Sequence, residues 1–468
     1  MADFTAAQIA EATGGRLIAG DAPAACSGIA TDSRVVGAGQ CFVALRGERF
    51  DGHDFVGDAL AAGAAGAVVS RVPDGLDIGS AALASRLRNR APFLIQVADT
   101  LKALGDLARC HRRRFSIPVI GVTGSTGKTT TKDMIAAILS RRGAVAVTPE
   151  NYNNEIGVPL AVLSLSGEHR AAAIEMAMRG RGEIAYLAAM AAPTIAVITN
   201  IGLSHLERLG CPDAIADAKG ELIEAVGAGA SVLPADDPYC ERLAARAQGP
   251  VLSFGLSEGA QFRAAEMATG DEGTRFRLLC PAGEAQVRLS APGRHQALNS
   301  LAAAAAASAA GAALDDITAG LGAFTASHAR AQVVESRAGF CILNDSYNAS
   351  PASVEAALDL LSDMNARRRV AILGDMLELG PASPELHRAV GEQAAQAGVD
   401  LLIAVGEMAR FIADGARAAM TEDRVRWTQS NDEAAAWALD ALRPGDVVLV
   451  KASRAMAFER ITGRLADA

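Results

Sequence analysis

At 468 residues, the chain is longer than a single hydrophobic core usually supports, which predicts two or three domains. Half of the residues are apolar, which excludes a disordered protein, and the net charge of −9 argues against a nucleic-acid-binding surface. The seven cysteines are scattered without a CxxC pair, which indicates free thiols in a reducing cytosol and gives no zinc signature.

Two stretches of the chain that could be mistaken for membrane segments do not have the properties of one. Residues 1–15 read as a short amphipathic helix without a signal-peptide pattern. The alanine-rich run 301–314 is too short and too weakly apolar to cross a bilayer, and it reads as a tightly packed buried helix. We therefore expect a cytoplasmic protein without a membrane span.

Three segments follow one another along the chain, and together they predict an α/β protein. In residues 1–98, short apolar runs such as CFVAL and AVVS alternate with turns, which predicts a small α/β domain. Residues 99–325 begin with a helical stretch and continue as alternating strands and helices, which is typical of a parallel sheet with crossover helices. Residues 326–468 contain FCILND, RVAILGD, DLLIAVG and DVVLVKAS, each followed by a loop and a helix, which predicts a doubly wound, Rossmann-like domain.

The stretch VIGVTGSTGKTTTKDMIAAIL (119–139) carries the strongest chemical signal. A strand ends in a glycine loop, and a helix then begins, so that backbone N–H groups and the helix dipole can hold phosphates. Lys128 would reach the β- and γ-phosphates, and the Thr129 hydroxyl would bind Mg²⁺. Val122 stands where the first glycine of GxxxxGK[ST] is expected, and the open alternative is a glycine-rich turn without a ligand. The residues predicted to contact ATP here are Gly124, Ser125, Thr126, Gly127, Lys128, Thr129 and Thr130.

Polar residues that follow the next apolar runs are weaker candidates. Glu175 ends the run AAAIEM, where a second Mg²⁺ ligand belongs, although a strand-end glutamate is also often solvated. His205 follows the strand TIAVITN in a loop. His295 and Asn299 lie four residues apart near the start of a helix, so they can grip a base or ribose together, or simply cap the helix. An NKxD guanine motif is absent, which favours ATP over GTP.

Lys219 stands out because the chain rarely uses lysine. Of the 44 lysines and arginines, only five are lysines: Lys102, Lys128, Lys132, Lys219 and Lys451. Only lysine readily loses its proton and acts as an amine, so a retained lysine raises the question of whether an amine is needed. The alternative is a solvated helix residue.

Together these stretches resemble the ATP-dependent Mur ligases of peptidoglycan synthesis, over essentially the whole chain. TDSRVVGAGQCFVALRGERFDGHDF (31–55) resembles the family's UDP-sugar-binding domain, and TGSTGKTTTK is similar to its phosphate loop. NYNNEIGVPL (151–160), GDMLELG (374–380) and VKASRAMAFE (450–459) resemble the branch that adds D-alanyl-D-alanine. The DNPR motif of the diaminopimelate-adding branch is absent, and folylpolyglutamate synthases share the ATPase core but not the first domain.

The resemblance implies a role for each candidate in the middle domain. A lysine positioned like Lys219 is carbamylated by CO₂ in this family and helps to hold a second Mg²⁺, which an arginine could not do. Glu175 and His205 become Mg²⁺ ligands together with Thr129. His295 and Asn299 match the family's HNxxN helix, with Gln296 in place of the usual asparagine.

The resemblance also implies contacts from the last domain and to the substrates. Asp345 and Asn348 are expected to contact the nucleotide, and Arg330 to approach the γ-phosphate, although Ala329 departs from the family pattern. Ser33, Arg34 and the loop from Gly47 to His53 are candidates for the UDP-sugar, with a plain surface arginine as the alternative for Arg34. The group of Lys451, Ser453 and Arg454 would bind the carboxylate of the dipeptide, or cap the following helix. The full set of candidate substrate residues is Ser33, Arg34, Gly47, Asp51, His53, Asn153, Asn154, Lys451, Ser453 and Arg454.

The activity implied by the resemblance is amide ligation through an acyl phosphate, with Lys128, Lys219, His205 and Arg330 as catalytic residues. ATP, two Mg²⁺ ions, UDP-N-acetylmuramoyl-tripeptide and D-alanyl-D-alanine are the implied cofactors and substrates, and a monomer is expected. Two alternatives are a sister ligase that adds the third stem residue and an ATPase module in which hydrolysis drives a shape change. The second leaves the UDP-sugar-like first domain without a purpose.

Overall fold

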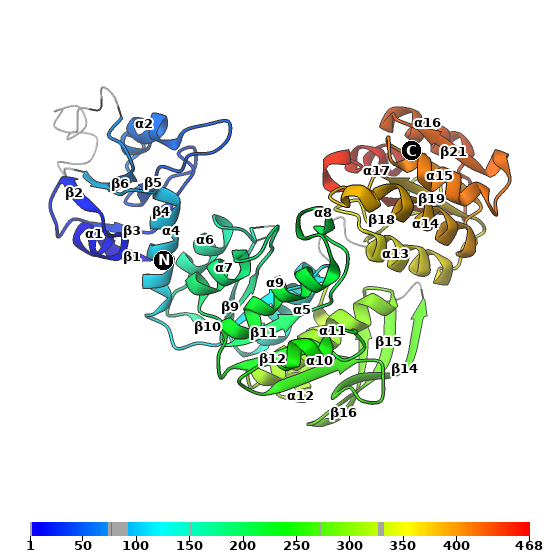
Figure 1. Ribbon diagram of the computed structural model, residues 1–468, viewed down its shortest axis with the longest axis horizontal. Helices are drawn as coiled ribbons and strands as arrows, with labels where there is room; N and C mark the ends of the chain where they lie inside the picture. The colour runs from blue at the N-terminus through cyan, green and yellow to red at the C-terminus, as the bar shows by residue number, and fades with distance from the viewer. Residues whose placement is uncertain (1, 74–75, 77–91, 150–151, 271–272, 326–331) are drawn as a thin grey trace. The chain divides into compact units, whose positions relative to one another are not determined.

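The computed structural model describes residues 2–73, 76, 92–149, 152–270, 273–325 and 332–468 (Figure 1). Two compact units divide the chain: Met1–Gly121 with Arg142–Ala177 and Glu183–Ile195, and Val122–Arg141 with Met178–Gly182 and Ala196–Ala468. Each of the three predicted segments carries a main sheet of its own in the described part of the chain. The predicted domain borders at 98/99 and 325/326 stay predictions, and Arg330 lies outside the described residues.

The first sheet has five strands among the described residues, in the order β2-β7-β6-β5-β4. The pairs β4·β5, β5·β6 and β6·β7 are parallel, and β2·β7 is antiparallel. Helix α1 starts with a capping box at Thr5 and ends at Gly14 in the left-handed conformation. The elements here are β1 (Asp3–Thr5), α1 (Ala6–Thr13), β2 (Arg16–Ala19), β3 (Ala25–Ser27), β4 (Ile29–Ala30), β5 (Cys41–Val43), α2 (Val56–Ala61), β6 (Gly66–Val69), β7 (Phe93–Gln96) and α4 (Thr100–Arg112).

The middle sheet has nine strands among the described residues, in the order β16-β15-β14-β13-β12-β11-β8-β10-β9. Its strands are β8 (Val119–Thr123), β9 (Ala144–Val147), β10 (His169–Glu175), β11 (Ile195–Ile198), β12 (Ala230–Pro234), β13 (Val251–Gly255), β14 (Phe262–Gly270), β15 (Gly273–Cys280) and β16 (Gly283–Leu289). The pairs β9·β10, β12·β13 and β13·β14 are parallel, as the sequence predicts. The last three strands instead form an antiparallel meander, which the parallel reading of this segment does not include.

Helices connect the strands of the middle segment. They are α5 (Lys128–Leu139), α6 (Gly157–Leu163), α7 (Glu183–Ala191), α8 (Leu206–Leu209), α9 (Pro212–Ala225), α10 (Cys240–Ala244), α11 (Arg294–Ala309) and α12 (Leu314–Ala323). The alanine-rich run expected to be a packed helix is α11, and its alanines from Ala302 to Ala307 are fully buried. Within the described residues, no helix has both the length and the apolar character needed to cross a membrane.

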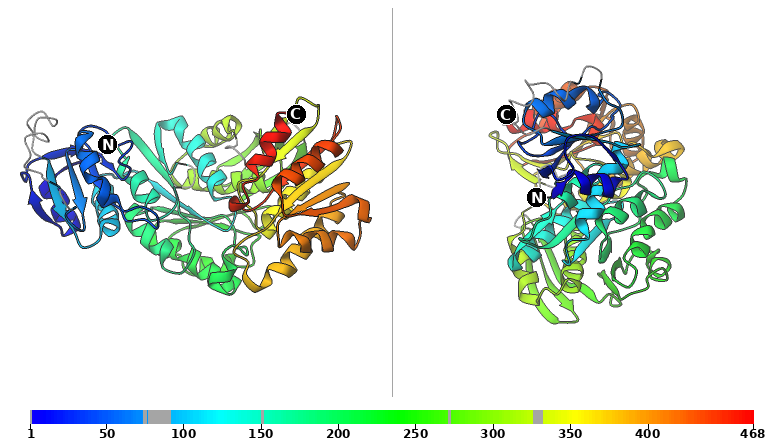
Figure 2. Two further views of the ribbon diagram at one scale, coloured as in Figure 1. Left: turned by 90° about the horizontal axis from the view of Figure 1, so that it is seen from above. Right: turned by 90° about the vertical axis from the view of Figure 1, so that its left-hand side faces the viewer.

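The last sheet has six strands among the described residues, in the order β17-β18-β22-β19-β20-β21, and only the β17·β18 pair is antiparallel. Helices α13, α14 and α15 bury their apolar residues against one face, and α16 and α17 against the other. Figure 2 shows this sheet, yellow to orange, between its two helical layers, so the predicted doubly wound fold is confirmed. The elements are β17 (Gln332–Glu335), β18 (Cys341–Asn344), α13 (Pro351–Asp363), β19 (Arg369–Gly374), α14 (Ser383–Gln396), β20 (Leu401–Val405), α15 (Ala409–Arg417), β21 (Val425–Thr428), α16 (Asn431–Ala441), β22 (Val447–Lys451) and α17 (Glu459–Ala466).

Candidate active site

The phosphate loop joins β8 to α5 through two glycines that no other residue could replace without strain. Gly124 has φ +149° and Gly127 has φ +77°, both in the region that disfavours side chains. A Cβ atom added at Gly124 would lie 1.8 Å from Thr199 Oγ1, and one at Gly127 would lie 2.3 Å from Asn299 Oδ1. The glycines therefore allow the loop to lie directly against its neighbours, and α5 points its N-terminus at the loop.

The end of β11 holds this loop in place. The Thr126 N–H donates to Asn200 Oδ1 at 3.1 Å, and Asn200 Nδ2 donates to the Thr126 carbonyl at 3.2 Å and hydroxyl at 2.9 Å. The Thr199 hydroxyl donates to the Thr126 carbonyl at 2.5 Å, and the Gly202 N–H donates to Ser125 Oγ at 2.8 Å. Asn200 was not among the predicted site residues; the only sequence signal is its position directly after the run TIAVIT.

Lys128 and Thr129 begin α5, as the motif predicts. Lys128 Nζ donates to the carbonyls of Gly124 at 2.7 Å and Ser125 at 3.1 Å, so the ammonium lies across the loop. Thr129 and Thr130 are buried. A loop that combines a lysine ammonium, positive-φ glycines and a helix N-terminus fits the polyphosphate chain of a nucleotide.

Lys219 lies in the middle of α9 and is 1% exposed, so it is not a solvated helix residue. Burial lowers the pKa of its amine well below the usual value, and the positive charge of Lys128 lowers it further. The structure therefore brings Lys219 near the phosphate loop and favours its neutral amine. This is the chemical form that a reaction with CO₂ requires.

His205 lies within electrostatic range of Lys128 and Lys219. Burial is the main cause that lowers the pKa of its imidazole; Lys128 and Lys219 lower it further, while Glu378 raises it. His205 has φ +63°, an uncommon conformation for a residue with a side chain, and its Nδ1 lies 2.6 Å from Glu378 Oε2. Glu378, which also has a positive φ of +63°, lies in the stretch GDMLELG but was not itself predicted.

Glu175 is also buried, which rules out the solvated alternative. Its carboxylate accepts a hydrogen bond from Asn153 Nδ2 at 2.8 Å, and its N–H donates to the Thr148 hydroxyl at 2.9 Å. The predicted substrate residue Asn153 thus contacts a predicted metal ligand. Asn154 instead accepts hydrogen bonds from the backbone N–H groups of Ile156 and Gly157 at the start of α6.

The two residues predicted on α11 differ in environment. Asn299 is buried against the phosphate loop, and its Oδ1 accepts a hydrogen bond from Thr131 at 3.5 Å. The pKa of His295 is lowered, chiefly by burial, while Asp345 raises it and Lys451 lowers it. His295 therefore lies within electrostatic range of two residues predicted from the last segment.

Those two residues, Asp345 and Lys451, form an ion pair, and Lys451 Nζ also donates to the Asn348 carbonyl at 2.9 Å. Ser453 Oγ accepts a hydrogen bond from the Leu377 N–H at 2.9 Å, so it supports the GDMLELG loop. Arg454 is exposed and lies over the ring of Tyr347 at 5.7 Å. The ion pair between Asp345 and Lys451 thus joins a residue predicted to contact the nucleotide to one predicted to bind the dipeptide.

The candidates for the UDP-sugar lie in the first sheet's loops. The side chain of Arg34 is 84% exposed, and it donates two hydrogen bonds to the Asp32 carboxylate, from Nη2 to Oδ2 at 2.6 Å and from Nε to Oδ1 at 2.9 Å. Ser33 lies between the two residues in the sequence. The hydrogen bonds from Arg34 lower the pKa of Asp32 to about 2. Gly47 closes a turn by donating to the carbonyl of Phe50.

His53 is enclosed rather than exposed. Its Nδ1 lies 2.5 Å from Asp51 Oδ1, and its Nε2 accepts from the Ser70 N–H at 2.9 Å. The pKa of Asp51 is lowered, first by the hydrogen bond from the His53 N–H and then by the side chains of His53 and Arg71. Both residues therefore shape the loop that begins at Gly47.

The predicted metal ligands are of mixed type. Across the described ranges, no three histidine, cysteine, aspartate or glutamate side chains gather as a metal site would require. The predicted set, Thr129, Glu175, His205 and Lys219, contains only two such residues. A carboxylate group on Lys219 would add an oxygen ligand of the kind that Mg²⁺ prefers, beside the oxygens of Thr129 and Glu175 and the imidazole nitrogen of His205.

Comparisons with known proteins agree with one another over the whole chain. Three family profiles match: "Mur ligase family, catalytic domain" at residues 25–112, "Mur ligase middle domain" at 122–307, and "Mur ligase, glutamate ligase domain" at 329–454. UDP-N-acetylmuramoyl-tripeptide--D-alanyl-D-alanine ligase of Bacillus subtilis is 36% identical over 94% of this chain and 93% of its own length. The protein of the same name from Escherichia coli is 35% identical over 100% of this chain and 99% of its own.

Solved structures give the same result. A crystal structure of MurF from Acinetobacter baumannii matches with a TM-score of 0.90 and 33% identity, covering 99% of both chains. MurF ligase from Thermotoga maritima, solved in complex with ADP, matches with a TM-score of 0.81 and 29% identity, covering 94% of this chain and 96% of that one.

Proposed function

Because the chain belongs to the Mur ligase family, we propose that it is an ATP-dependent ligase that adds D-alanyl-D-alanine to UDP-N-acetylmuramoyl-tripeptide. The observation that carries the ligase chemistry is the placement of Lys128, His205 and Lys219 together at a phosphate loop. The choice of acceptor rests on full-length relatives of that name.

The reaction needs ATP because a carboxylate is a poor electrophile. Transfer of the γ-phosphoryl group to the terminal carboxylate of the tripeptide gives an acyl phosphate and ADP. The amine of D-alanyl-D-alanine then attacks the acyl carbon, and phosphate leaves. Lys128 and the N–H groups of the loop would offset the repulsion between the phosphate chain and the carboxylate, and hold both in reacting positions.

The metal site is the finer part of the proposal. Thr129, Glu175, His205 and a carbamylated Lys219 would hold the two Mg²⁺ ions, which neutralise phosphate charge when bound. Burial of Lys219 and the nearby charge of Lys128 support this, since both favour the neutral amine. That amine attacks CO₂, a C–N bond forms, and one proton leaves to water, so the product is an anionic carbamate.

The remaining predicted roles rest on the same resemblance. His295, Asn299, Asp345, Asn348 and Arg330 are proposed to contact ATP. The UDP-sugar is proposed to lie at the loops that contain Arg34 and Gly47, and the dipeptide carboxylate at Lys451. Action as a cytoplasmic monomer that does not bind nucleic acid stays a prediction.

Phosphate release from ATP and Mg²⁺ tests the proposal, with UDP-N-acetylmuramoyl-tripeptide and D-alanyl-D-alanine supplied singly and together. We expect release only with both, and mass spectrometry should find a UDP-linked pentapeptide. Release with a single amino acid in place of the dipeptide would identify a sister ligase. Release that is indifferent to both substrates would instead identify an ATPase module and refute the ligase proposal.

A further inference from the structure

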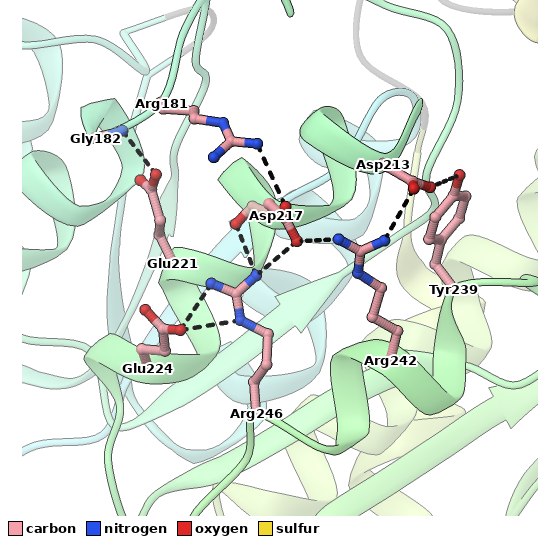
Figure 3. A network of polar contacts seen from close by, with 9 residues as sticks. All are labelled: Arg181, Gly182, Asp213, Asp217, Glu221, Glu224, Tyr239, Arg242 and Arg246. Carbon is pink, nitrogen blue, oxygen red and sulfur yellow. Dashed lines mark hydrogen bonds and ion pairs between the residues drawn. The ribbon is translucent and has the colours of Figure 1, made fainter. Parts of the chain in front are cut away.

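The outward face of α9, opposite Lys219, carries a polar network (Figure 3). Acidic residues on successive turns of the helix meet arginines from α10 and the residues after it, and from the loop before α7. The network consists of Arg181, Gly182, Asp213, Asp217, Glu221, Glu224, Tyr239, Arg242 and Arg246. It lies on the one helix that must present Lys219 to the phosphate loop.

Arg246 differs from the other arginines because it binds the backbone of α9. Its Nη1 donates to the Asp217 carbonyl at 2.9 Å, and its Nε and Nη2 donate to Glu224 Oε1 at 3.0 and 2.7 Å. Arg242 instead pairs with the carboxylates of Asp213, at 3.3 Å, and Asp217, at 2.7 Å, and within the described part of the chain it makes no hydrogen bond to the helix backbone. A carboxylate at the end of a side chain can move with its partner, whereas a backbone carbonyl moves only with the helix.

The absence of a side chain at Gly220 allows the Arg246 guanidinium to reach the backbone of α9. A Cβ atom at this position would lie 2.3 Å from Arg246 Nη1 and 2.6 Å from Cζ, so any side chain would displace the guanidinium. A glycine inside a helix costs roughly 1 kcal/mol relative to alanine, which makes it a poor choice for the helix itself. Its position beside Lys219 in the sequence means that the guanidinium lies against the turn that carries the buried amine.

We propose that Arg246, seated against Gly220, is a positioning residue that fixes the rotation of α9 and thereby places the Lys219 amine for carbamylation. Successive residues of an α-helix are about 100° apart, so a modest rotation of α9 would swing Lys219 away from its buried place. The ion pair of Arg246 with Glu224 is partly exposed, at 22% and 57% for the two side chains, and ion pairs open to solvent in this way add little to stability. The contact is therefore better suited to setting geometry than to holding the fold together. The inference rests on the proposed function of Lys219.

Three variants test the inference. Gly220→Ala displaces the guanidinium while improving helix propensity, and Arg246→Ala removes it. Arg242→Ala is the matched control, since it removes ion pairs to the same helix without touching its backbone. Each variant is examined with ¹³C-labelled bicarbonate by NMR for the carbamate signal of Lys219, and by ligation kinetics at varied bicarbonate concentrations and thermal unfolding.

We expect Gly220→Ala and Arg246→Ala to need at least about tenfold more bicarbonate for half-maximal carbamate signal, equivalent to about 1.4 kcal/mol. In both, kcat should rise again when bicarbonate is added, which a merely structural defect would not do. The melting temperature of Gly220→Ala should stay at or above the wild-type value, and Arg242→Ala should behave as wild type throughout.

Wild-type bicarbonate dependence in both Gly220→Ala and Arg246→Ala would overturn the inference. So would the absence of a Lys219 carbamate from the wild-type protein, even if that protein ligates its substrates. A wild-type protein that forms the carbamate but does not ligate D-alanyl-D-alanine would count against the proposed function and leave the role of Arg246 standing.

Discussion

Replacing Asn200 by alanine removes the side chain that fastens the phosphate loop to the end of β11. Three hydrogen bonds to Thr126 disappear, one accepted from its N–H at 3.1 Å and two donated to its carbonyl and hydroxyl. The Thr199 hydroxyl still donates to the Thr126 carbonyl, so that oxygen keeps a partner, whereas the Thr126 N–H loses its acceptor.

The magnitude follows from these contacts. A neutral hydrogen bond contributes about 0.5–1.5 kcal/mol net, and the three that are lost here are part-buried, so water can replace some of them. The arrangement of the loop that binds phosphate should therefore lose roughly 1–3 kcal/mol relative to displaced arrangements. Since about 1.4 kcal/mol is a factor of ten, the KM for ATP should rise roughly 5- to 150-fold.

The assay is phosphate release with both organic substrates saturating and ATP varied. Asn431→Ala serves as the control, because Asn431, at the start of α16, donates a comparable hydrogen bond to the Met456 carbonyl at 2.8 Å and, among the described residues, makes no hydrogen bond to the phosphate loop. It should lower the melting temperature without changing the KM for ATP. A KM for ATP in Asn200→Ala equal to the wild-type value would show that the contacts from Thr199 and Gly202 hold the loop without the Asn200 side chain, contrary to this reasoning.

Three further variants probe other parts of the site. Gly124→Ala, whose Cβ would meet Thr199 at 1.8 Å and whose φ is +149°, should lower kcat/KM for ATP by at least about tenfold, measured by the same assay. Lys219→Met keeps an apolar stem but removes the amine, so ligation should fall by at least about a hundredfold while the melting temperature is kept or raised; an active variant would contradict the assigned role. Arg34→Ala should raise the pKa of Asp32 from about 2 toward 3.8 but not fully, since the N–H of residue 34 still donates to it. Ionised Asp32 stabilises the fold above its unfolded pKa of 3.8, and this stabilisation is lost as the pH falls through about 2. In the variant the folded-state pKa lies closer to 3.8, so NMR titration should show Asp32 becoming protonated at a higher pH.

The sequence predicts those parts of the site that are contiguous in the chain. The phosphate loop, the strand-end carboxylate of Glu175 and the alternation of strands and helices follow from local composition and periodicity, and the structure has them. Asn200 and Glu378 could not be found in this way, because their importance comes from contacts with residues 74 and 173 positions away. The meander of residues 262–289 was missed for a related reason, since strand direction depends on pairing rather than on the composition of each strand.

Gly220 illustrates a different limit. In the sequence it is a helix-breaking residue inside a helical pattern, and propensity alone treats it as a defect. Its purpose becomes visible only when Arg246, from a segment 26 residues later, is found against it. A glycine in a helix can therefore mark the approach of a side chain from elsewhere, which local propensity does not report.

The environments of the buried lysines show why the preference for arginine in this chain points to chemistry at Lys219. Lys451 is buried against the carboxylate of Asp345, and Lys132 lies 3.1 Å from Asp133, so each ammonium has an anion beside it. Lys219 is buried just as deeply, yet the charged neighbour that shifts its pKa is another cation, Lys128. Burial and the positive charge of Lys128 both disfavour an ammonium group at Lys219. The fold therefore accommodates Lys219 as a neutral amine or after its conversion to an anion. Conversion to a carbamate turns the repulsion with Lys128 into an attraction, which is a physical reason for this site to retain the one cationic residue that can give up its charge.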